Sequence, residues 1–312
     1  MSIDTSFQGA KWLSTNLNLD DDEVFNLAQK NNISIQLSKL LVNRKIKTIS
    51  KFINSKLKEN LSITKIAKLS SLDKSISFFE KVKSEKKISI FSDYDVDGAC
   101  AAAICKKFLS QFDIEVNVYI PNRLNEGYGL NLEAIDKILT FSQNILVLDC
   151  GSNNLKEQEY IINQGGQVMI IDHHECELFF DQAIVVNPKT PNDQSELDDL
   201  CATALTFLVL VYLKNENIFP NIDVLQYLDL VALATICDLV PLSEVNRSFV
   251  KQGLKVINSN SVNKGIQTLI NQSKIKQQIS EYHLGYILGP RINTGGRMGE
   301  SLLGYSLLSS DN

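Results

Sequence analysis

The sequence predicts an α/β fold built around a parallel sheet, on two observations. Short apolar runs that are typical of buried strands occur at residues 87–91, 115–120, 145–148, 167–171 and 183–186. Helical stretches separate most of these runs, at about residues 99–110, 131–140, 155–164 and 199–214. Strands and helices that alternate in this way form βαβ units, in which helices cover the faces of a parallel sheet. We therefore expect a Rossmann-like sheet domain whose ligands gather beyond the carboxyl ends of the strands.

Helices without strands are expected on either side of this sheet domain. Three acids, Asp20 to Asp22, precede an apolar pattern that includes Val24 and Leu27, which is typical of a helix start. We predict an N-terminal helical arm over residues 1–75, a catalytic domain with the parallel sheet over residues 76–240, and a C-terminal helical segment over residues 241–312.

The composition is that of a globular protein with a sizeable core. At 312 residues and 44% hydrophobic residues, the chain has room for about two domains. Its start lacks a basic region followed by an apolar core, and its longest apolar run, Cys201 to Leu213, is too short to span a bilayer. We therefore expect a soluble, cytoplasmic protein without membrane contact. The six cysteines contain no CxxC pair, which favours buried reduced thiols over disulfides or cysteine-held zinc.

The charge of the chain is unevenly distributed. The net charge of −5 argues weakly against a nucleic-acid partner, yet fourteen lysines and arginines stand against four acids between Lys39 and Lys87. Such a basic block could meet a polyanion such as nucleic acid. The alternative, an ordinary solvated face, stays open.

Acidic side chains follow the first predicted strand. The apolar run Ile88 to Phe91 leads into Asp93, Asp95 and Asp97, and Gly98 then opens an alanine-rich helical stretch. Three carboxylates within five residues repel one another, so a hard divalent cation is expected among them. A polar turn, or a helix N-terminus whose dipole favours acids, is the simpler alternative.

Further polar residues stand at equivalent positions of the predicted topology. Asp149 follows one strand, Asp172, His173 and His174 follow the next, and Asp238 ends an apolar helix. Each could separately cap a helix or satisfy a core hydrogen bond. Seven residues together predict one cleft: Asp93, Asp95, Asp97, Asp149, His173, His174 and Asp238. Carboxylates with one or two imidazoles fit Mn²⁺ or Mg²⁺, and nitrogen ligands favour Mn²⁺. Two such metals, about 3.5–4 Å apart and sharing a carboxylate, catalyse phosphoryl transfer, so we expect metal-dependent phosphoester hydrolysis.

Several motifs carry a resemblance to a known family. DYDVDG (93–98), DCG (149–151), DHH (172–174) and ATICDLVPL (234–242) resemble, in order and spacing, the four motifs of the DHH phosphoesterases. PNRLNEGYGL (121–130) and GPRINTGGRMGE (289–300) resemble the RecJ branch, exonucleases that degrade single-stranded DNA from 5′ to 3′ in recombination and repair. The resemblance implies single-stranded DNA as the partner and a two-metal site with Mn²⁺ or Mg²⁺.

The same resemblance implies roles for individual residues. The implied metal ligands are Asp93, Asp95, Asp97, Asp149, His173 and Asp238, with Asp149 as the bridge and Asp93 as either a ligand or a close neighbour. Asp172 is expected to orient His173, and His174 to face the scissile phosphate or the water on the metal, so that the implied catalytic residues are His174, Asp149 and Asp172. The implied substrate-binding residues are Arg123, Tyr128, Arg291, Asn293 and Arg297. A surface salt bridge is the alternative for Arg291 and Arg297.

The sequence also departs from the family pattern. Ser92 stands where glycine is usual, Ala99-Cys100 follow the first motif, and Thr294-Gly295 replace a common alanine pair, but no implied ligand is lost. Family members continue into a second domain, with a glycine-rich substrate motif, and an OB-type barrel. We therefore expect a complete metal site, half of a substrate groove and impaired turnover.

Two other functions remain open at this point. One is a DHH phosphodiesterase of short oligonucleotides or cyclic dinucleotides, which the N-terminal arm and the segment 289–300 disfavour. The other is a non-catalytic nucleic-acid-binding relative, which the intact ligand set disfavours.

Overall fold

The computed structural model describes residue 9 and residues 20–46, 48–178 and 180–311. The chain divides into two compact units, Met1–Asn54 and Ser55–Asn312. The domain boundaries that the sequence predicts, after residues 75 and 240, stay predictions.

The described residues of the first unit form three short helices: α1 (Asp21–Asn31), α2 (Ile35–Asn43) and α3 (Ile49–Asn54). The Asp20 carboxylate accepts the N–H of Asp22 at 2.9 Å and so caps the start of α1, where an acid also complements the helix dipole. The buried Ser38 hydroxyl donates to the carbonyl of Val24 at 2.8 Å, which fixes α2 on α1.

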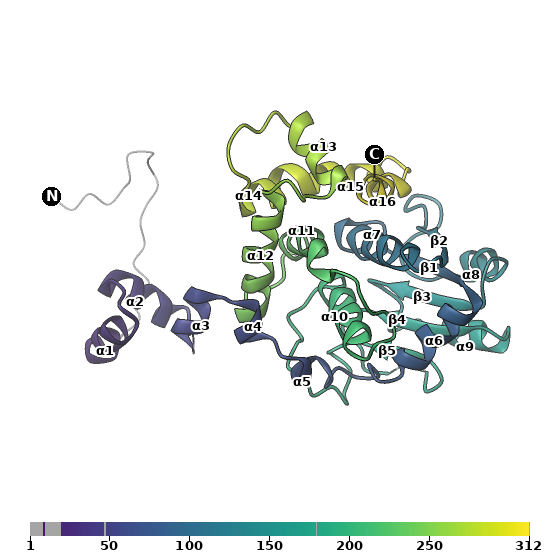
Figure 1. The fold of residues 1–312 in the computed structure, drawn as a ribbon, viewed down its shortest axis with the longest axis horizontal. Coiled ribbons are helices and arrows are strands. Elements are labelled where there is room, and N and C mark those ends of the chain that lie inside the picture. Colours follow the sequence, from purple (N-terminus) through teal and green to yellow (C-terminus); the bar gives the residue numbers. More distant parts are fainter. Residues whose placement is uncertain (1–8, 10–19, 47, 179, 312) are drawn as a thin grey trace. The chain divides into compact units, whose positions relative to one another are not determined.

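The second unit is built on a five-stranded parallel sheet in the order β2-β1-β3-β4-β5 (Figure 1). Its strands are β1 (Lys87–Ser92), β2 (Glu115–Tyr119), β3 (Asn144–Leu148), β4 (Gln167–Ile171) and β5 (Ile184–Val186). The predicted parallel sheet is thus confirmed. Ser92 pairs with Leu148, and Leu148 with Ile171, so the residues that follow these three strands emerge side by side.

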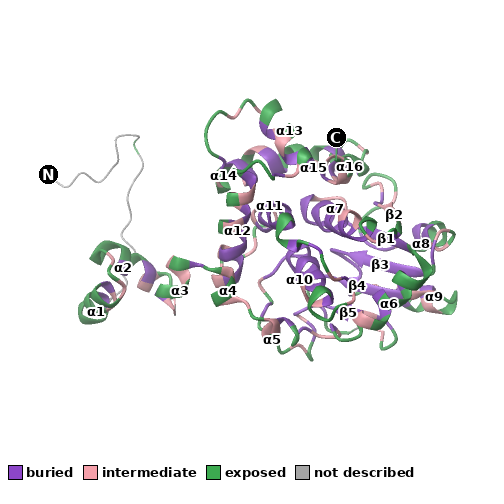
Figure 2. Ribbon diagram, viewed as in Figure 1, coloured by how far each residue is buried: buried purple, intermediate pink, exposed green. Residues whose placement is uncertain are grey.

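Alternating strand residues build a core on each face of the sheet. On one face Ile90, Leu146 and Met169 pack with helices α6 (Ser75–Glu85), α7 (Val96–Ser110), α10 (Ala202–Asn215) and α11 (Leu228–Cys237). On the other face Phe91 and Val147 pack with α8 (Leu132–Leu139) and α9 (Leu155–Asn163). Figure 2 shows β1, β3 and β4 and the helices α7, α10 and α11 as largely buried, whereas no residue of the edge strand β2 is buried.

The remaining elements of the second unit are helical. Two short helices, α4 (Leu57–Asn60) and α5 (Ile63–Ile66), begin it, and a 3-10 turn, η1 (Val224–Tyr227), precedes α11. After α11 come α12 (Glu244–Ile257), α13 (Lys264–Gln272), α14 (Glu281–His283), the π-helix η2 (Leu284–Leu288), α15 (Gly289–Arg297) and α16 (Leu302–Ser309). None of the described helices combines the length and the apolar character that a bilayer crossing needs.

Helix α11 holds this C-terminal half together. The buried Asp229 carboxylate accepts the N–H of Leu230 and that of Asn263, each at 2.7 Å, and so ties the start of α11 to the start of α13. Helix α12 crosses α11 at Gly253, where a Cβ atom would lie 2.2 Å from the Leu228 carbonyl oxygen and 2.3 Å from the Ala232 Cβ. Only glycine allows the two helices this close an approach.

We predict that Gly253→Ala lowers the free energy of unfolding by about 1–3 kcal/mol, because the added methyl group overpacks the contact between α11 and α12. Gly296→Ala is the matched control, since a Cβ atom there meets its nearest neighbour at an ordinary 3.5 Å. Urea denaturation of both variants measures the difference. Equal stability of the two variants would contradict the close packing described for α11.

Candidate metal centre

The residues that follow β1, β3 and β4 meet the end of α11 at one edge of the sheet. Within the described part of the chain, three overlapping groups of side chains bring ligand atoms within 4.8 Å of one another. The groups are Asp93, Asp95 and Asp149; Asp97, His173 and Asp238; and Asp149, His173 and His174. The structure therefore brings together all seven strand-end and helix-end residues that the sequence singled out as lining one cleft.

The turn after β1 is shaped by local hydrogen bonds. The Asp95 carboxylate caps α7 by accepting the N–H groups of Asp97 at 2.8 Å and Gly98 at 3.1 Å. A Cβ atom on Gly98 would lie 2.4 Å from the Asp93 carbonyl oxygen, so a larger residue would push the strand end away from the helix. The Ser92 hydroxyl, which stands where the family has glycine, donates to the Gly98 carbonyl at 2.8 Å and closes the turn.

Asp97 has a structural role that the sequence did not reveal. Its buried carboxylate accepts the N–H of Ala202 at 2.7 Å and that of Thr203 at 2.9 Å, both at the start of α10. An anion at this position complements the positive end of the helix dipole. Asp97 therefore fixes α10 against the sheet while its Oδ2 atom also lies 3.9 Å from Nε2 of His173.

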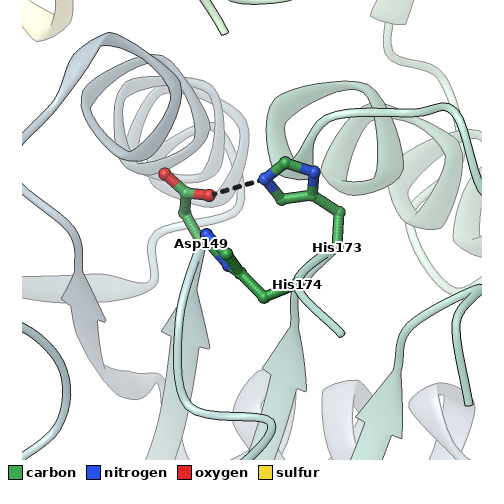
Figure 3. Close-up of side chains that lie close together, drawn as sticks. All are labelled: Asp149, His173 and His174. Atoms are coloured by element: carbon green, nitrogen blue, oxygen red, sulfur yellow. Dashed lines mark ion pairs between the residues drawn. The ribbon is translucent and has the colours of Figure 1, made fainter. Parts of the chain in front are cut away.

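Asp149 occupies a strained backbone position. Its N–H continues the β3–β4 ladder by donating to the Ile171 carbonyl at 2.9 Å, but its φ angle is 62°, in the left-handed region. A non-glycine residue there costs about 1–3 kcal/mol, and such strain is concentrated at functional sites. The turn directs the carboxylate toward His173, whose Nε2 atom lies 3.4 Å from Oδ1 of Asp149 (Figure 3).

His173 lies at the middle of the cluster. Besides Asp149, its Nε2 atom has Oδ2 of Asp238 at 3.6 Å. Burial lowers the pKa of the His173 ring, which favours the neutral form that binds metals.

The expectation that Asp172 orients His173 is wrong. Oδ1 of Asp172 lies 2.7 Å from Nδ1 of His174, while His173 contributes only its backbone N–H, also at 2.7 Å. Oδ2 of Asp172 accepts the N–H of Ser152 at 3.1 Å. Burial alone would raise the pKa of Asp172, but the hydrogen bonds with His174 and Ser152 lower it to about 2. The same bond with Asp172 raises the pKa of His174, so Asp172 positions the second histidine and not the first.

The carboxylates are electrostatically unsatisfied. Burial, and next the charge of Asp95, raises the pKa of Asp93 to about 7. Burial, and next the charges of Asp97 and Asp95, likewise raises the pKa of Asp238 to about 7. Oδ1 of Asp93 and Oδ2 of Asp238 are buried without a hydrogen-bond partner in the described part of the chain. Unpaired carboxylate oxygens that repel one another around an imidazole fit a hard divalent cation such as Mn²⁺ or Mg²⁺.

The predicted substrate-binding residues lie at different distances from this cluster. The Arg123 guanidinium lies 5.2 Å from the ring centre of Tyr94, the residue between Asp93 and Asp95 in the sequence. The Tyr128 hydroxyl lies 3.4 Å from Nε2 of His174. Helix α15 passes the same Tyr94, since a Cβ atom on Gly296 would lie 3.5 Å from its ring.

The three predicted residues of α15 differ in exposure. Arg291 and Arg297 are exposed, while the Asn293 side-chain oxygen is buried and unpaired in the described part of the chain. Tyr94 was not predicted from the sequence, although its place between Asp93 and Asp95 was a signal. The sequence also gave no sign that Leu239, the residue after Asp238, has a side chain 87% exposed to solvent. The DNA contacts expected of Arg123, Tyr128, Arg291, Asn293 and Arg297 stay predictions.

Comparison with known proteins agrees with this geometry. Residues 87–235 match the DHH family, N-terminal domain. The similarity to this family thus covers the five strands of the sheet and most of the candidate ligands. The chain is 32% identical over 232 residues to the single-stranded-DNA-specific exonuclease RecJ of Thermus thermophilus, covering 74% of this chain and 34% of that protein. It is 29% identical over 259 residues to RecJ of Salmonella typhimurium, covering 78% and 45%. The chain thus spans less than half the length of these relatives.

Solved structures show the same likeness. A crystal structure of exonuclease RecJ bound to manganese matches with a TM-score of 0.70 and 30% identity, covering 78% of this chain and 62% of that one. The crystal structure of Thermus thermophilus RecJ in complex with Mn²⁺ matches in fold with a TM-score of 0.78 and 24% identity, covering 94% and 42%.

We predict that Mn²⁺ binding releases protons and strengthens from pH 6 to pH 8. The metal binds the ionised carboxylates, and below the pKa values of about 7 it must displace protons from Asp93 and Asp238. The affinity should change by up to about tenfold per pH unit for each proton displaced, and level off above pH 8. Calorimetry in two buffers of different ionisation enthalpy counts the protons, and Asp238→Asn should release fewer. Binding that is independent of pH would contradict the electrostatics described.

Proposed function

We propose that this chain is the catalytic part of a metal-dependent phosphodiesterase that removes nucleotides from single-stranded DNA in the 5′ to 3′ direction, in recombination and repair. One observation carries the proposal: five carboxylates and the His173 ring meet at the carboxyl edge of a parallel sheet, and buried oxygens of Asp93 and Asp238 have no hydrogen-bond partner in the described part of the chain. The similarity to RecJ exonucleases supports the choice of substrate and direction.

Asp93, Asp95, Asp97, Asp149, His173 and Asp238 would hold two divalent cations, Mn²⁺ or Mg²⁺. When bound, such a pair of cations neutralises the phosphate and supplies an activated water at neutral pH. Asp149 and His173 each belong to two of the three ligand groups. A carboxylate has two oxygens to offer to two cations, whereas a neutral imidazole offers one nitrogen, which supports the assignment of Asp149 as the shared ligand.

We assign His174 the role of general acid in the reaction. The hydrogen bond that its Nδ1 atom makes to the Asp172 carboxylate fixes the ring and raises its pKa, which favours the protonated form. Its side chain is 47% exposed, and the neighbour of Nε2 is the hydroxyl of the exposed Tyr128, so a phosphate oxygen could reach the ring at the edge of the cluster. A proton held there stabilises charge on the phosphate or on the leaving oxygen, as a general acid does.

Positive charge around the centre would bind the DNA backbone. Arg123 lies over Tyr94 at the rim, and the exposed Arg291 and Arg297 extend along α15. The basic block between Lys39 and Lys87 extends over both compact units, and Lys47 lies outside the described residues. Lys39, Lys56 and Lys81 already pair with acids, so this block contributes less free charge than its sequence indicates.

We predict that Asp149→Ala abolishes Mn²⁺-dependent hydrolysis of a 5′-phosphorylated single strand. Loss of a shared ligand removes several kcal/mol of transition-state stabilisation, which corresponds to a rate at least about 100-fold lower. The matched control is Asp136→Ala, which removes a carboxylate that bonds only the exposed hydroxyl of Tyr160. Calorimetric Mn²⁺ binding, measured in parallel, should weaken in Asp149→Ala alone. Retained Mn²⁺-dependent turnover in that variant would mean that the shared ligand is misassigned.

The same assay separates the proposal from its alternatives. A rate that rises with strand length supports an exonuclease of single-stranded DNA. Faster hydrolysis of a dinucleotide or a cyclic dinucleotide would instead identify a phosphodiesterase of small nucleotides, and strand binding without turnover would identify a non-catalytic relative.

A further inference from the structure

Two tyrosines on the helical segment that packs against the end of α11 are stacked on each other and exposed to solvent. Tyr282 and Tyr286 lie four residues apart, with ring centres 5.2 Å apart and planes inclined by 26°. At 60% and 75% exposure they are the two most exposed aromatic side chains in the part of the chain that the structure describes. Aromatic pairs at this spacing stabilise a helix only slightly. Helix stability therefore does not explain why both rings are exposed to solvent.

The helix that carries these rings packs on the last turn of α11. A Cβ atom on Gly285 would lie 3.2 Å from Cγ2 of Ile236, and one on Gly289 only 2.4 Å from Sγ of Cys237. The residue after Cys237 is Asp238, a member of the metal centre. The glycines therefore let this helix approach the end of α11 closely. Tyr286 follows Gly285 directly and Tyr282 precedes it by three residues, and both tyrosines are exposed to solvent. Tyr286 also lies in the π-helix η2, and single π turns are frequent at functional sites.

A cation accompanies the stacked rings. Nη1 of Arg291 donates to the carbonyl of Ile287 at 2.7 Å, so the guanidinium folds back over the turn that carries Tyr286. Arg291 is exposed and forms no ion pair with an acid among the described residues. Stacked aromatic faces next to an unpaired cation are what a single-stranded nucleic acid requires, with bases on the rings and phosphates at the cation.

We propose that Tyr282 and Tyr286 form a stacking platform for the bases of a single strand whose phosphates run past Arg291 and whose end lies at the metal centre. The inference rests on the proposed function and adds how an unpaired strand is recognised. Paired bases hide their faces in the duplex stack, so such a platform selects single strands without selecting a sequence.

The test compares ring-deleting and ring-retaining variants of the 312-residue chain. Fluorescence anisotropy, with EDTA to prevent turnover, measures binding of an oligothymidylate of about twelve nucleotides and of an abasic strand of equal length. The double variant Tyr282→Ala/Tyr286→Ala should bind the oligothymidylate at least about fivefold more weakly. Tyr282→Phe/Tyr286→Phe keeps both rings and should bind like the wild type. The abasic strand should bind all three proteins equally, because it offers no base to stack.

An alanine variant that loses affinity equally for both strands, or for neither, would overturn the proposal. Thermal melting and Mn²⁺ titration of each variant check that the fold and the metal centre are intact. If the alanine variant binds strands normally but changes its oligomeric state in gel filtration, the rings serve a protein contact and the platform is also refuted. Mn²⁺-dependent hydrolysis of a 5′-phosphorylated single strand by the wild type, at saturating strand concentration, separates the two claims. It tests the proposed function whatever the variants show about the platform.

Discussion

The mutual repulsion of buried carboxylates at one edge of the sheet is the constraint on which the rest of the structure depends. Asp93, Asp95, Asp149 and Asp238 all have raised pKa values, because burial removes water from anions that already face one another. Removing charges from water in this way destabilises the fold unless an opposite charge is present. The chain holds this arrangement with hydrogen bonds that leave selected oxygens unpaired, which is the arrangement that a divalent cation completes.

Each acid is positioned by a different local interaction, and these interactions explain why the motif residues occur where they do. Asp95 caps α7, Asp97 anchors the start of α10, and Asp149 is directed by a left-handed backbone turn. Gly98 is required because the strand end and the helix start nearly touch. Asp172 secures the next turn and the ring of His174. Rigid strands and helices thus position the cluster, and a large apolar core on both sheet faces supplies the stability that the cluster opposes.

Much of this could be predicted from sequence, for a physical reason. Strands buried on both faces appear as apolar runs, so the central strands β1, β3 and β4, and the polar residues that follow them, were visible without a structure. What could not be predicted depends on contacts between distant segments. Nothing local indicates that Asp97 binds α10, that Asp172 selects His174 over His173, or that Tyr282 and Tyr286 stack in solvent next to α11. These features follow from how helices pack, and periodicity alone does not specify packing.

The cluster at the sheet edge is interpreted as a two-cation site, and anomalous diffraction from crystals soaked in Mn²⁺ tests this interpretation most directly. We expect two manganese peaks among the cluster's ligands, one nearer Asp93 and Asp95, one nearer Asp97 and Asp238, with Asp149 between them. Asp149→Ala crystals soaked in the same way should lose at least one peak. The absence of manganese at this edge under saturating conditions, or peaks only elsewhere on the chain, would contradict the two-cation site.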